Sequence, residues 1–330
     1  MPHIEDVDRF VFIVGAPRCG TTTMARWLQY HPQILFPFVK EPHYFLQYDL
    51  RSLDDGDLRR RVEHDYLDHY FAQPKPPQTV GADGSVSYLY APEQLEPVLK
   101  LWPNSRFVVG VRDPLALLPS LHKRLIFTGD ENIRSFQDAW AAVPDRAANR
   151  RIPWSTIDPR FLRYDEAARY GTYVERLFKA VGKERCLVMV FDDLVADPGA
   201  QHRRLLEFAG LELVPPPEFK REREGKGVRY LFLQQLLKRP PRILLPYLAT
   251  LRFQGRFDKE AGKKASETAP GTGSKSLRKR LLRWNRAPED KTPVPLAVQR
   301  EIQAHYKGEV DKLGELIGRD LSHWLQPSSC

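Results

Sequence analysis

Short apolar runs alternate with amphipathic stretches along most of the chain, and this alternation predicts the order of its elements. We expect strands, each an apolar run of strand length, at about 10–15, 34–36, 79–83, 106–111 and 186–191. We expect helices, each with apolar residues near helical spacing, at about 21–31, 56–72, 92–101, 115–126, 164–181, 199–209 and 296–317. Strands that alternate with helices are typical of an α/β fold, a parallel sheet with helices on both faces.

The loop after the first predicted strand is the most informative stretch, and it reads Gly15-Ala16-Pro17-Arg18-Cys19-Gly20-Thr21-Thr22. A strand, a glycine-bounded loop and a helix in this order form a phosphate cradle, because loop N–H groups and the helix N-terminus converge on an anion. A nucleoside triphosphatase has Lys after the second glycine, whereas this chain has Thr21, and the only cation inside the loop is Arg18. We therefore predict a P-loop-like anion site that does not transfer a γ-phosphate. A helix that is merely capped by threonine is the alternative.

A second anion site is predicted where the strand at 106–111 ends. The strand runs directly into Arg112, and Ser120 follows eight residues later on the next predicted helix. An arginine pairs with phosphate through two parallel hydrogen bonds, and a hydroxyl adds another. Two anion sites without an evident metal site indicate a nucleotide with a 5′-group and a separate 3′-phosphate. A salt-bridged arginine and a surface serine are the alternative.

Charge separates the two ends of the chain. Its 330 residues carry a net charge of +9, from 51 basic and 42 acidic residues. Residues 221–290 alone hold 18 Lys or Arg against 7 Asp or Glu, which suits an anionic partner such as a nucleotide, an acidic glycan or a lipid surface. We expect an α/β core at 1–215 and a basic, partly mobile C-terminal region at 216–330 that packs on it. The role of the basic segment 259–286, of which 259–276 looks like a mobile loop, stays open.

Cysteine usage and hydropathy favour a cytoplasmic protein. Cys19, Cys186 and Cys330 are scattered, with neither metal-ligand spacing nor a disulfide framework. The start of the chain lacks the pattern of a secretion signal, and the apolar stretch 243–251 is too short to cross a bilayer. We therefore expect no transmembrane span and no nucleic-acid partner, and we leave peripheral membrane contact open. The sequence does not indicate an oligomeric state.

Three motifs, in this order and spacing, resemble the sulfotransferases that use 3′-phosphoadenosine 5′-phosphosulfate (PAPS), in their bacterial and heparan-sulfate-type branch. Residues 17–22 are similar to the 5′-phosphosulfate loop, Arg112 with Ser120 to the 3′-phosphate pair, and Lys40-Glu41-Pro42-His43-Tyr44-Phe45 to the block after the second strand. Later similarity lies at 170–177, 186–194 and 318–325. The resemblance covers most of the chain and is weakest over about 125–160 and 235–285. It implies one sulfotransferase domain over 1–330 with the sulfotransferase fold.

This resemblance implies that PAPS is the co-substrate, that 3′,5′-bisphosphoadenosine is the product and that no metal is needed. The residues that it implies for PAPS binding are Arg18, Cys19, Gly20, Thr21, Thr22, Thr23, Arg112, Ser120, Tyr173, Lys226 and Gly227. Tyr173 fits core packing equally well. Lys226 and Gly227 follow a charge-dense stretch that departs from the family's late Lys-Gly loop, and Asp83-Gly84-Ser85 lacks a lysine that heparan-sulfate-type relatives often place nearby.

Glu41 is the predicted catalytic base, because sulfuryl transfer to a hydroxyl needs a proton acceptor beside the acceptor oxygen. The matching glutamate has this role in heparan-sulfate-type relatives. His43 is the rival base, since histidine titrates near neutrality, and a surface pairing with Lys40 is the non-catalytic alternative for Glu41. Arg18 stands where many sulfotransferases have Lys, so it can stabilise developing charge but cannot give up a proton.

The predicted function is metal-independent, in-line transfer of a sulfuryl group from PAPS to a hydroxyl or amine. The acceptor is predicted to be a carbohydrate or glycolipid, on the resemblance of residues 40–45, with other small molecules left open. One alternative is a degenerate P-loop kinase or nucleotidase, which would need a Mg²⁺-holding acid and a replacement for the missing lysine. Another is a non-enzymatic protein that binds a nucleotide or a glycan, in which Glu41 could be lost without consequence.

Overall fold

The structure is a computed structural model that describes residues 2–217, 226–241, 277–288 and 292–326. The chain forms two compact units, each built from segments far apart in the sequence. The first unit comprises Met1–Leu117, Ala168–Lys220 and Ile302–Cys330, and the second comprises Leu118–Ala167 and Arg221–Glu301. We describe each unit by itself, and a single catalytic domain over 1–330 stays a prediction.

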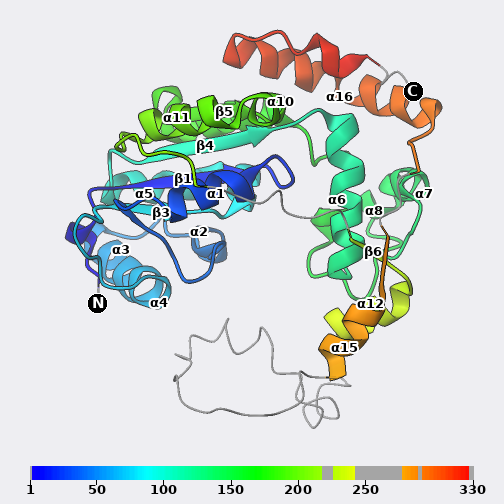
Figure 1. Ribbon diagram of the computed structural model, residues 1–330, viewed down its shortest axis with the longest axis horizontal. Helices are drawn as coiled ribbons and strands as arrows, with labels where there is room; N and C mark the ends of the chain where they lie inside the picture. The colour runs from blue at the N-terminus through cyan, green and yellow to red at the C-terminus, as the bar shows by residue number, and fades with distance from the viewer. Residues whose placement is uncertain (1, 218–225, 242–276, 289–291, 327–330) are drawn as a thin grey trace. The chain divides into compact units, whose positions relative to one another are not determined.

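A five-stranded parallel sheet is the centre of the first unit (Figure 1). Its strands are β1 (Arg9–Gly15), β2 (Ile34–Leu35), β3 (Val80–Asp83), β4 (Arg106–Val111) and β5 (Cys186–Val190), in the order β2-β3-β1-β4-β5. In register, Phe12 of β1 lies opposite Asp83 of β3 on one side and Phe107 of β4 on the other. The strands are almost continuously apolar because helices cover both faces of the sheet. The predicted α/β fold, with all five strands, is confirmed.

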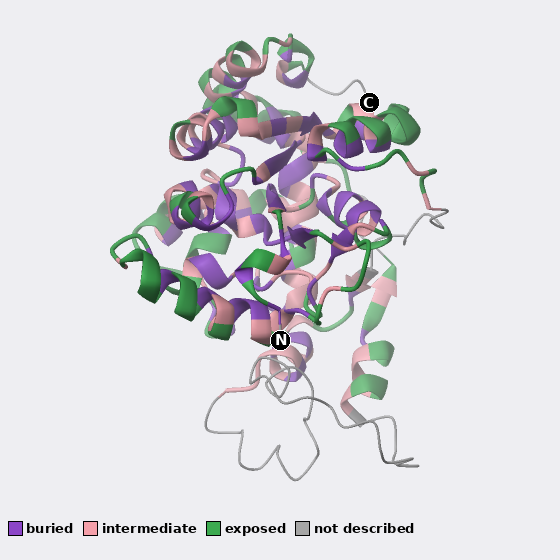
Figure 2. Ribbon diagram, turned by 90° about the vertical axis from the view of Figure 1, so that its left-hand side faces the viewer, coloured by how far each residue is buried: buried purple, intermediate pink, exposed green. Residues whose placement is uncertain are grey.

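The two faces of the sheet have different cores, because successive strand side chains point to opposite faces. Val11 and Ile13 of β1 belong to an aliphatic cluster that includes α1 (Thr21–Gln29) and α11 (Pro198–Ala209). On the other face Phe10 lies 4.5 Å, centroid to centroid, from Trp102, and Phe12 stacks on Phe107 at 5.5 Å. Figure 2 shows the strands buried and the outer helix faces exposed. The sheet is therefore a rigid base for the loops at its carboxyl edge.

Further helices of the first unit differ in detail from the predicted ones. They are α2 (Tyr44–Gln47), α3 (Asp55–Val62), a π-helical turn (Glu63–Leu67), α4 (Asp68–Tyr70), two 3-10 helices (Val86–Tyr90 and Pro92–Leu95), α5 (Glu96–Leu101), α9 (Tyr170–Val181), α10 (Phe191–Ala196) and a 3-10 helix at Ser322–Leu325. The helix predicted from 164 begins only at Tyr170, because the chain passes from the second unit to the first at Ala167 and Ala168. The pattern missed α10, which follows β5 without an intervening loop.

The second unit is mostly helical. It contains most of α6 (Pro114–Thr128), then α7 (Phe136–Ala141), α8 (Val143–Ala147), a 3-10 helix (Pro159–Leu162), α12 (Leu231–Lys238), α15 (Leu277–Trp284) and the start of α16 (Leu296–Ile317). Two short strands, β6 (Lys226–Val228) and β7 (Arg286–Pro288), pair antiparallel. The predicted loop at 259–276 and the apolar stretch 243–251 lie outside the described residues.

A buried ion pair organises the interior of the second unit. Arg146 donates to Glu131 at 2.7 Å, and both side chains are fully buried. Glu131 also accepts a hydrogen bond from the Tyr164 hydroxyl at 2.9 Å and from the backbone N–H groups of Asn132 and Ile133.

None of the helices within the described ranges is long and apolar enough to cross a membrane.

Candidate functional site

The loop between β1 and α1 has a backbone that only certain residues permit. Gly20 caps α1 with a φ of 79°, and a Cβ atom there would lie 2.2 Å from Cδ2 of Leu194. Arg18 also has a positive φ, 68°, which costs a non-glycine residue energy and is characteristic of functional loops. Ala16 N–H donates to the Gly110 carbonyl at 2.8 Å, and this anchors the loop on β4. The loop is held in one shape before any ligand arrives.

Exposure divides the loop into a supporting side and a presented side. The side chains of Cys19 and Thr21 are buried, whereas Arg18 and Thr22 are exposed. Cys19 Sγ lies 3.4 Å from the Tyr170 hydroxyl, and burial raises the pKa of this thiol to about 12, so it fills space and does not act as a nucleophile. The first N–H groups of a helix have no acceptor within the helix, and its dipole favours an anion at this end. The presented side is therefore suited to a phosphate or phosphosulfate group.

Arg112 connects this loop to the next strand end. Its Nη1 donates to the Arg18 carbonyl at 3.4 Å, and its guanidinium lies 4.4 Å from the ring centroid of Phe191. A cation over an aromatic face is attracted to it electrostatically, and the contact also fixes the guanidinium plane. Sequence reasoning missed Phe191, although it begins the Phe191-Asp192-Asp193-Leu194 run at the end of β5.

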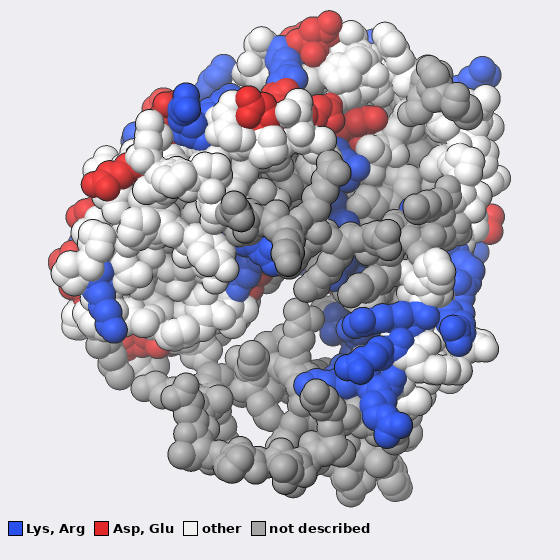
Figure 3. All heavy atoms as spheres, viewed as in Figure 1, with Lys and Arg blue, Asp and Glu red and all other residues white. Residues whose placement is uncertain are grey.

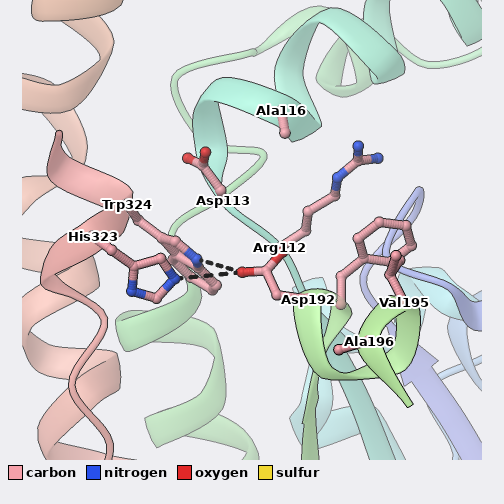
Figure 4. Close-up of a pocket in the computed structure, with 9 residues that line it drawn as sticks. Arg112, Asp113, Ala116, Asp192, Val195, Ala196, His323 and Trp324 are labelled. Carbon is pink, nitrogen blue, oxygen red and sulfur yellow. Dashed lines mark hydrogen bonds and ion pairs between the residues drawn. The ribbon is translucent and has the colours of Figure 1, made fainter. Parts of the chain in front are cut away.

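A hollow of about 480 Å³ lies beside Arg112 in the first unit (Figure 4). Within it, Asp192 accepts a hydrogen bond from Trp324 Nε1 at 3.0 Å and lies 3.5 Å from His323 Nε2. Arg319 forms a two-bond ion pair with the neighbouring Asp193. These contacts hold residues 319–324 against α10 within the first unit, and the packing of the whole region 216–330 on the core stays a prediction. Burial, with the nearby charge of Asp192, raises the pKa of Asp113 to about 6.

Glu41 and His43 follow β2 and lie beside each other. Glu41 Oε1 is 2.6 Å from Lys40 Nζ, and Glu41 Oε2 is 3.5 Å from His43 Nε2. Burial alone would raise the pKa of Glu41, but the hydrogen bond with His43 and the charge of Lys40 outweigh it and lower the pKa to about 2. Glu41 is therefore ionised throughout the physiological range, and both the predicted base and its rival belong to one cluster.

A network behind His43 fixes this cluster to the end of β3. The imidazole Nδ1 lies 2.7 Å from the Ser87 hydroxyl, and the His43 N–H donates to Ser85 Oγ at 2.9 Å. Ser85 N–H in turn donates to the buried Asp83, which also accepts from the Tyr66 hydroxyl at 2.9 Å. His43 has a φ of 54°, a backbone conformation that these contacts maintain. The network makes His43 a rigid neighbour of Glu41.

Gly84 brings the Glu41 cluster close to α1. Its N–H donates to the Lys40 carbonyl at 3.2 Å, and a Cβ atom on Gly84 would lie 3.7 Å from the Cβ of Ala25 in α1. Heparan-sulfate-type relatives often have a lysine near this position, whereas this chain has Gly84. Gly84, which has no side chain, lies between Lys40 and the first turns of α1.

The remaining predicted residues lie in different environments. Tyr173 is 9% exposed, and its ring packs edge-on to Tyr90 at 5.1 Å. Ser120 on α6 belongs to the second unit, as do Lys226 and Gly227 of β6, which pairs with β7. Arg18, Cys19, Gly20, Thr21, Thr22, Thr23 and Arg112 come together at the loop. Whether Tyr173, Ser120, Lys226 or Gly227 contacts a nucleotide stays a prediction.

Across the residues that the structure describes, no group of three or more His, Cys, Asp or Glu side chains could hold a metal ion. The features assembled at the loop are a helix N-terminus, cations and hydroxyls. These are donors, and they suit an anionic ligand.

A parallel sheet whose first strand ends in a glycine-bounded loop and a helix defines an α/β protein of the P-loop-like class. The chain belongs to the sulfotransferase family, whose family model matches residues 11–216. It is similar over 96% of its length to the crystal structure of a sulfotransferase from Alicyclobacillus acidocaldarius, of which 98% is covered, with a TM-score of 0.57 and 20% identity. The latter similarity concerns the fold.

Curated relatives match a much shorter part of the chain. A segment of 59 residues is 39% identical to carbohydrate sulfotransferase 15 of Homo sapiens, and equally to that of Rattus norvegicus. The match covers 17% of this chain and spans a tenth of the length of those relatives.

Proposed function

We propose that this protein is a PAPS-dependent sulfotransferase that transfers the sulfuryl group to a hydroxyl or amine of an acceptor. The observation that carries the proposal is that Arg112 donates to the backbone carbonyl of Arg18, so that one glycine-bounded loop has two arginines beside it, in a protein of the sulfotransferase family. Arg18 is on the presented side of the loop and Arg112 stands on Phe191. Two separate cations suit a ligand with two separate anionic groups, as PAPS has.

The proposed binding mode assigns each end of the nucleotide to one part of the site. The N–H groups at the start of α1, with Thr22 and Thr23, bind the 5′-phosphosulfate, and Gly20 allows close approach. Arg112 binds the 3′-phosphate, with Ser120 as its predicted companion. Such a site distinguishes PAPS and 3′,5′-bisphosphoadenosine from nucleotides that lack a 3′-phosphate.

The proposed chemistry is an in-line displacement at sulfur. Glu41 accepts the proton of the acceptor hydroxyl while the acceptor oxygen bonds to sulfur and the bond from sulfur to the phosphate oxygen breaks. Arg18 and the helix N–H groups stabilise the charge that develops on the transferred group and on the leaving oxygen. Because the pKa of Glu41 is lowered to about 2, the carboxylate is ionised at neutral pH and is in the form that accepts a proton. His43 orients the carboxylate.

A carbohydrate or glycolipid acceptor is part of the proposal. Its support is the 59-residue match to carbohydrate sulfotransferase 15. Metal independence and a cytoplasmic location are also proposed, from the resemblance and from cysteine usage respectively. An acceptor screen with radiolabelled PAPS in the presence of a chelator tests the acceptor and the metal together.

The decisive test is a metal-free titration with 3′,5′-bisphosphoadenosine, AMP and, separately, ATP with Mg²⁺. We expect the bisphosphate to bind much more tightly than AMP. Arg112→Ala should weaken bisphosphate binding by about 10- to 150-fold, from the ~1.5–3 kcal/mol of a charged hydrogen-bonded contact, and leave AMP binding nearly unchanged. Arg203→Ala, an exposed arginine on α11, is the matched control. Equal or tighter binding of ATP with Mg²⁺ would refute the proposal and favour a kinase-like protein.

A further inference from the structure

One part of the second unit has an extreme charge composition. Residues 226–241 contain four Lys or Arg and residues 277–288 contain five, and neither stretch contains Asp or Glu. The two stretches form β6 with α12 and α15 with β7, and they pair through these strands. The exposed cations among them are Arg229, Lys279, Arg280, Arg283 and Arg286. Figure 3 shows Lys and Arg side chains gathered over α12 and α15.

Three of these cations line a pocket of about 200 Å³. Lys238 of α12 and Lys279, Arg283 and Arg286 from α15 and β7 line it, together with Phe127, Gln234 and Leu282. Within the described part of the chain, no carboxylate forms an ion pair with Lys279, Arg283 or Arg286. The pocket is thus the size of a small polar group and has positive charge on several sides, which suits a phosphate ester.

A pair of aromatic rings adjoins the cations. Tyr230 and Trp284 stack with their centroids 5.6 Å apart, and each is 53% exposed. Arg229 lies over the Trp284 ring at 5.3 Å. The rings are held firmly, because the fully buried Asn285 accepts from Tyr230 N–H at 2.8 Å and donates to its carbonyl at 3.0 Å. We call Arg229, Tyr230, Lys279, Arg283, Trp284 and Arg286 the basic-aromatic surface.

We propose that the basic-aromatic surface binds anionic phospholipid membranes, with a lipid phosphate in the pocket. Clustered Lys and Arg on an amphipathic helix are attracted to the negative potential of anionic lipids, and tyrosine and tryptophan rings favour the membrane–water interface. An acidic glycan has negative charge, as an anionic phospholipid does, but its hydroxyl groups also need neutral polar side chains as hydrogen-bond partners.

The neutral polar side chains of this region are already engaged. Gln234, Gln235 and Asn285 are the only amides in 226–241 and 277–288, and all three are buried. Gln234 donates to the Phe127 carbonyl at 2.6 Å and Gln235 to Ser155 at 2.8 Å, while Asn285 holds Tyr230. The exposed chemistry of the surface is cationic and aromatic, which matches a lipid headgroup layer better than a sugar chain.

The test is co-sedimentation of the full chain with phosphatidylcholine vesicles that contain either no phosphatidylglycerol or a third of it. We expect binding only to the anionic vesicles, with a steep decrease at high salt. Lys279→Gln/Arg283→Gln/Arg286→Gln should weaken partitioning on the order of 100-fold. The charge-matched control is Lys100→Gln/Arg203→Gln/Arg204→Gln, which removes three exposed cations from the first unit and should bind as wild type.

Two further measurements make the result decisive. Arg283→Lys/Arg286→Lys, which keeps the charge, should retain vesicle binding, and circular dichroism with urea unfolding checks that the variants are folded. Equal vesicle binding by the triple variant and its control would overturn the proposal, as would capture by a sulfated oligosaccharide without vesicle binding. Vesicle binding requires no sulfuryl transfer, so this proposal and the proposed enzymatic function can fail independently.

Discussion

Replacing Glu41 by Gln tests the assignment of the base with little change of shape. The side chain keeps its length, but it loses the charge that faces Lys40 at 2.6 Å and the capacity to accept a proton. Removal of a general base typically costs 10²–10⁴-fold in rate. We expect kcat to fall within that range, while the affinity for 3′,5′-bisphosphoadenosine changes less than about threefold, because Arg18 and Arg112 carry the proposed nucleotide contacts.

The pH dependence of kcat/KM gives an independent test of whether Glu41 is the base. With a pKa of about 2, Glu41 remains more than about 99% ionised at pH 5. If Glu41 is the base, kcat/KM of the wild type should therefore stay level from about pH 8 down to about pH 5. A histidine base would instead lose activity as imidazole takes up a proton, which generally happens between about pH 7 and 6.

The assay is initial-rate transfer from radiolabelled PAPS at saturating and limiting acceptor, over this pH range, for wild type, Glu41→Gln and His43→Gln. We expect His43→Gln to be impaired but to keep a level profile, since His43 orients Glu41 at 3.5 Å. A wild-type decrease of about tenfold or more between pH 7.5 and 5 that is absent in His43→Gln would refute the reasoning. So would a Glu41→Gln enzyme with nearly full kcat.

Two stability predictions concern buried carboxyl groups. Asp113 has a pKa raised from 3.8 to about 6, so its ionisation destabilises the folded state as the pH rises from about 4 to 6. Asp113→Asn keeps the side-chain oxygen that accepts from Leu115 N–H but has no charge. This variant should be more stable than wild type at pH 7.5 by up to ~3 kcal/mol and should have no advantage at pH 4. Urea unfolding at both pH values measures this, and an equal difference at both would contradict it. Arg146→Leu should cost ~3–5 kcal/mol by leaving Glu131 buried and charged, whereas Glu131→Gln/Arg146→Leu should recover much of the loss in the same assay. A cost below ~1 kcal/mol for Arg146→Leu would show that water reaches Glu131.

Local patterns were sufficient to predict the sheet. Each of the five strands is mostly apolar, and short apolar runs indicate buried strands without knowledge of their neighbours. The loop between β1 and α1 could be predicted equally well, because its glycines and the helix that follows are adjacent in the chain. The predicted ends of the elements were less accurate. The helix predicted from 164 begins at Tyr170, near the point where the chain passes between the two units, and no local sequence pattern marks that point.

Contacts between distant residues explain what the sequence alone left out. The Phe191 ring under Arg112 is 79 residues further along the chain, and the partner of Asp192 is Trp324. Residues 186–194 and 318–325 each resemble relatives in sequence, but the hydrogen bond that joins Asp192 to Trp324 forms only in the folded structure. The positive φ of Arg18 is another feature that the sequence did not predict. A glycine at this position would have indicated a positive φ, because glycine adopts it readily, whereas an arginine gives no such indication.

The contacts that support α10 have a consequence for the order in which the first unit folds. Arg319 and Trp324 hold Asp193 and Asp192 of α10, and Leu194 of the same helix lies against Gly20. Asp193 and Arg319 are 126 residues apart in the sequence, and the entropy lost in closing a long segment delays such contacts during folding. We therefore expect the support of Gly20 to form late, after the strands of the sheet have paired.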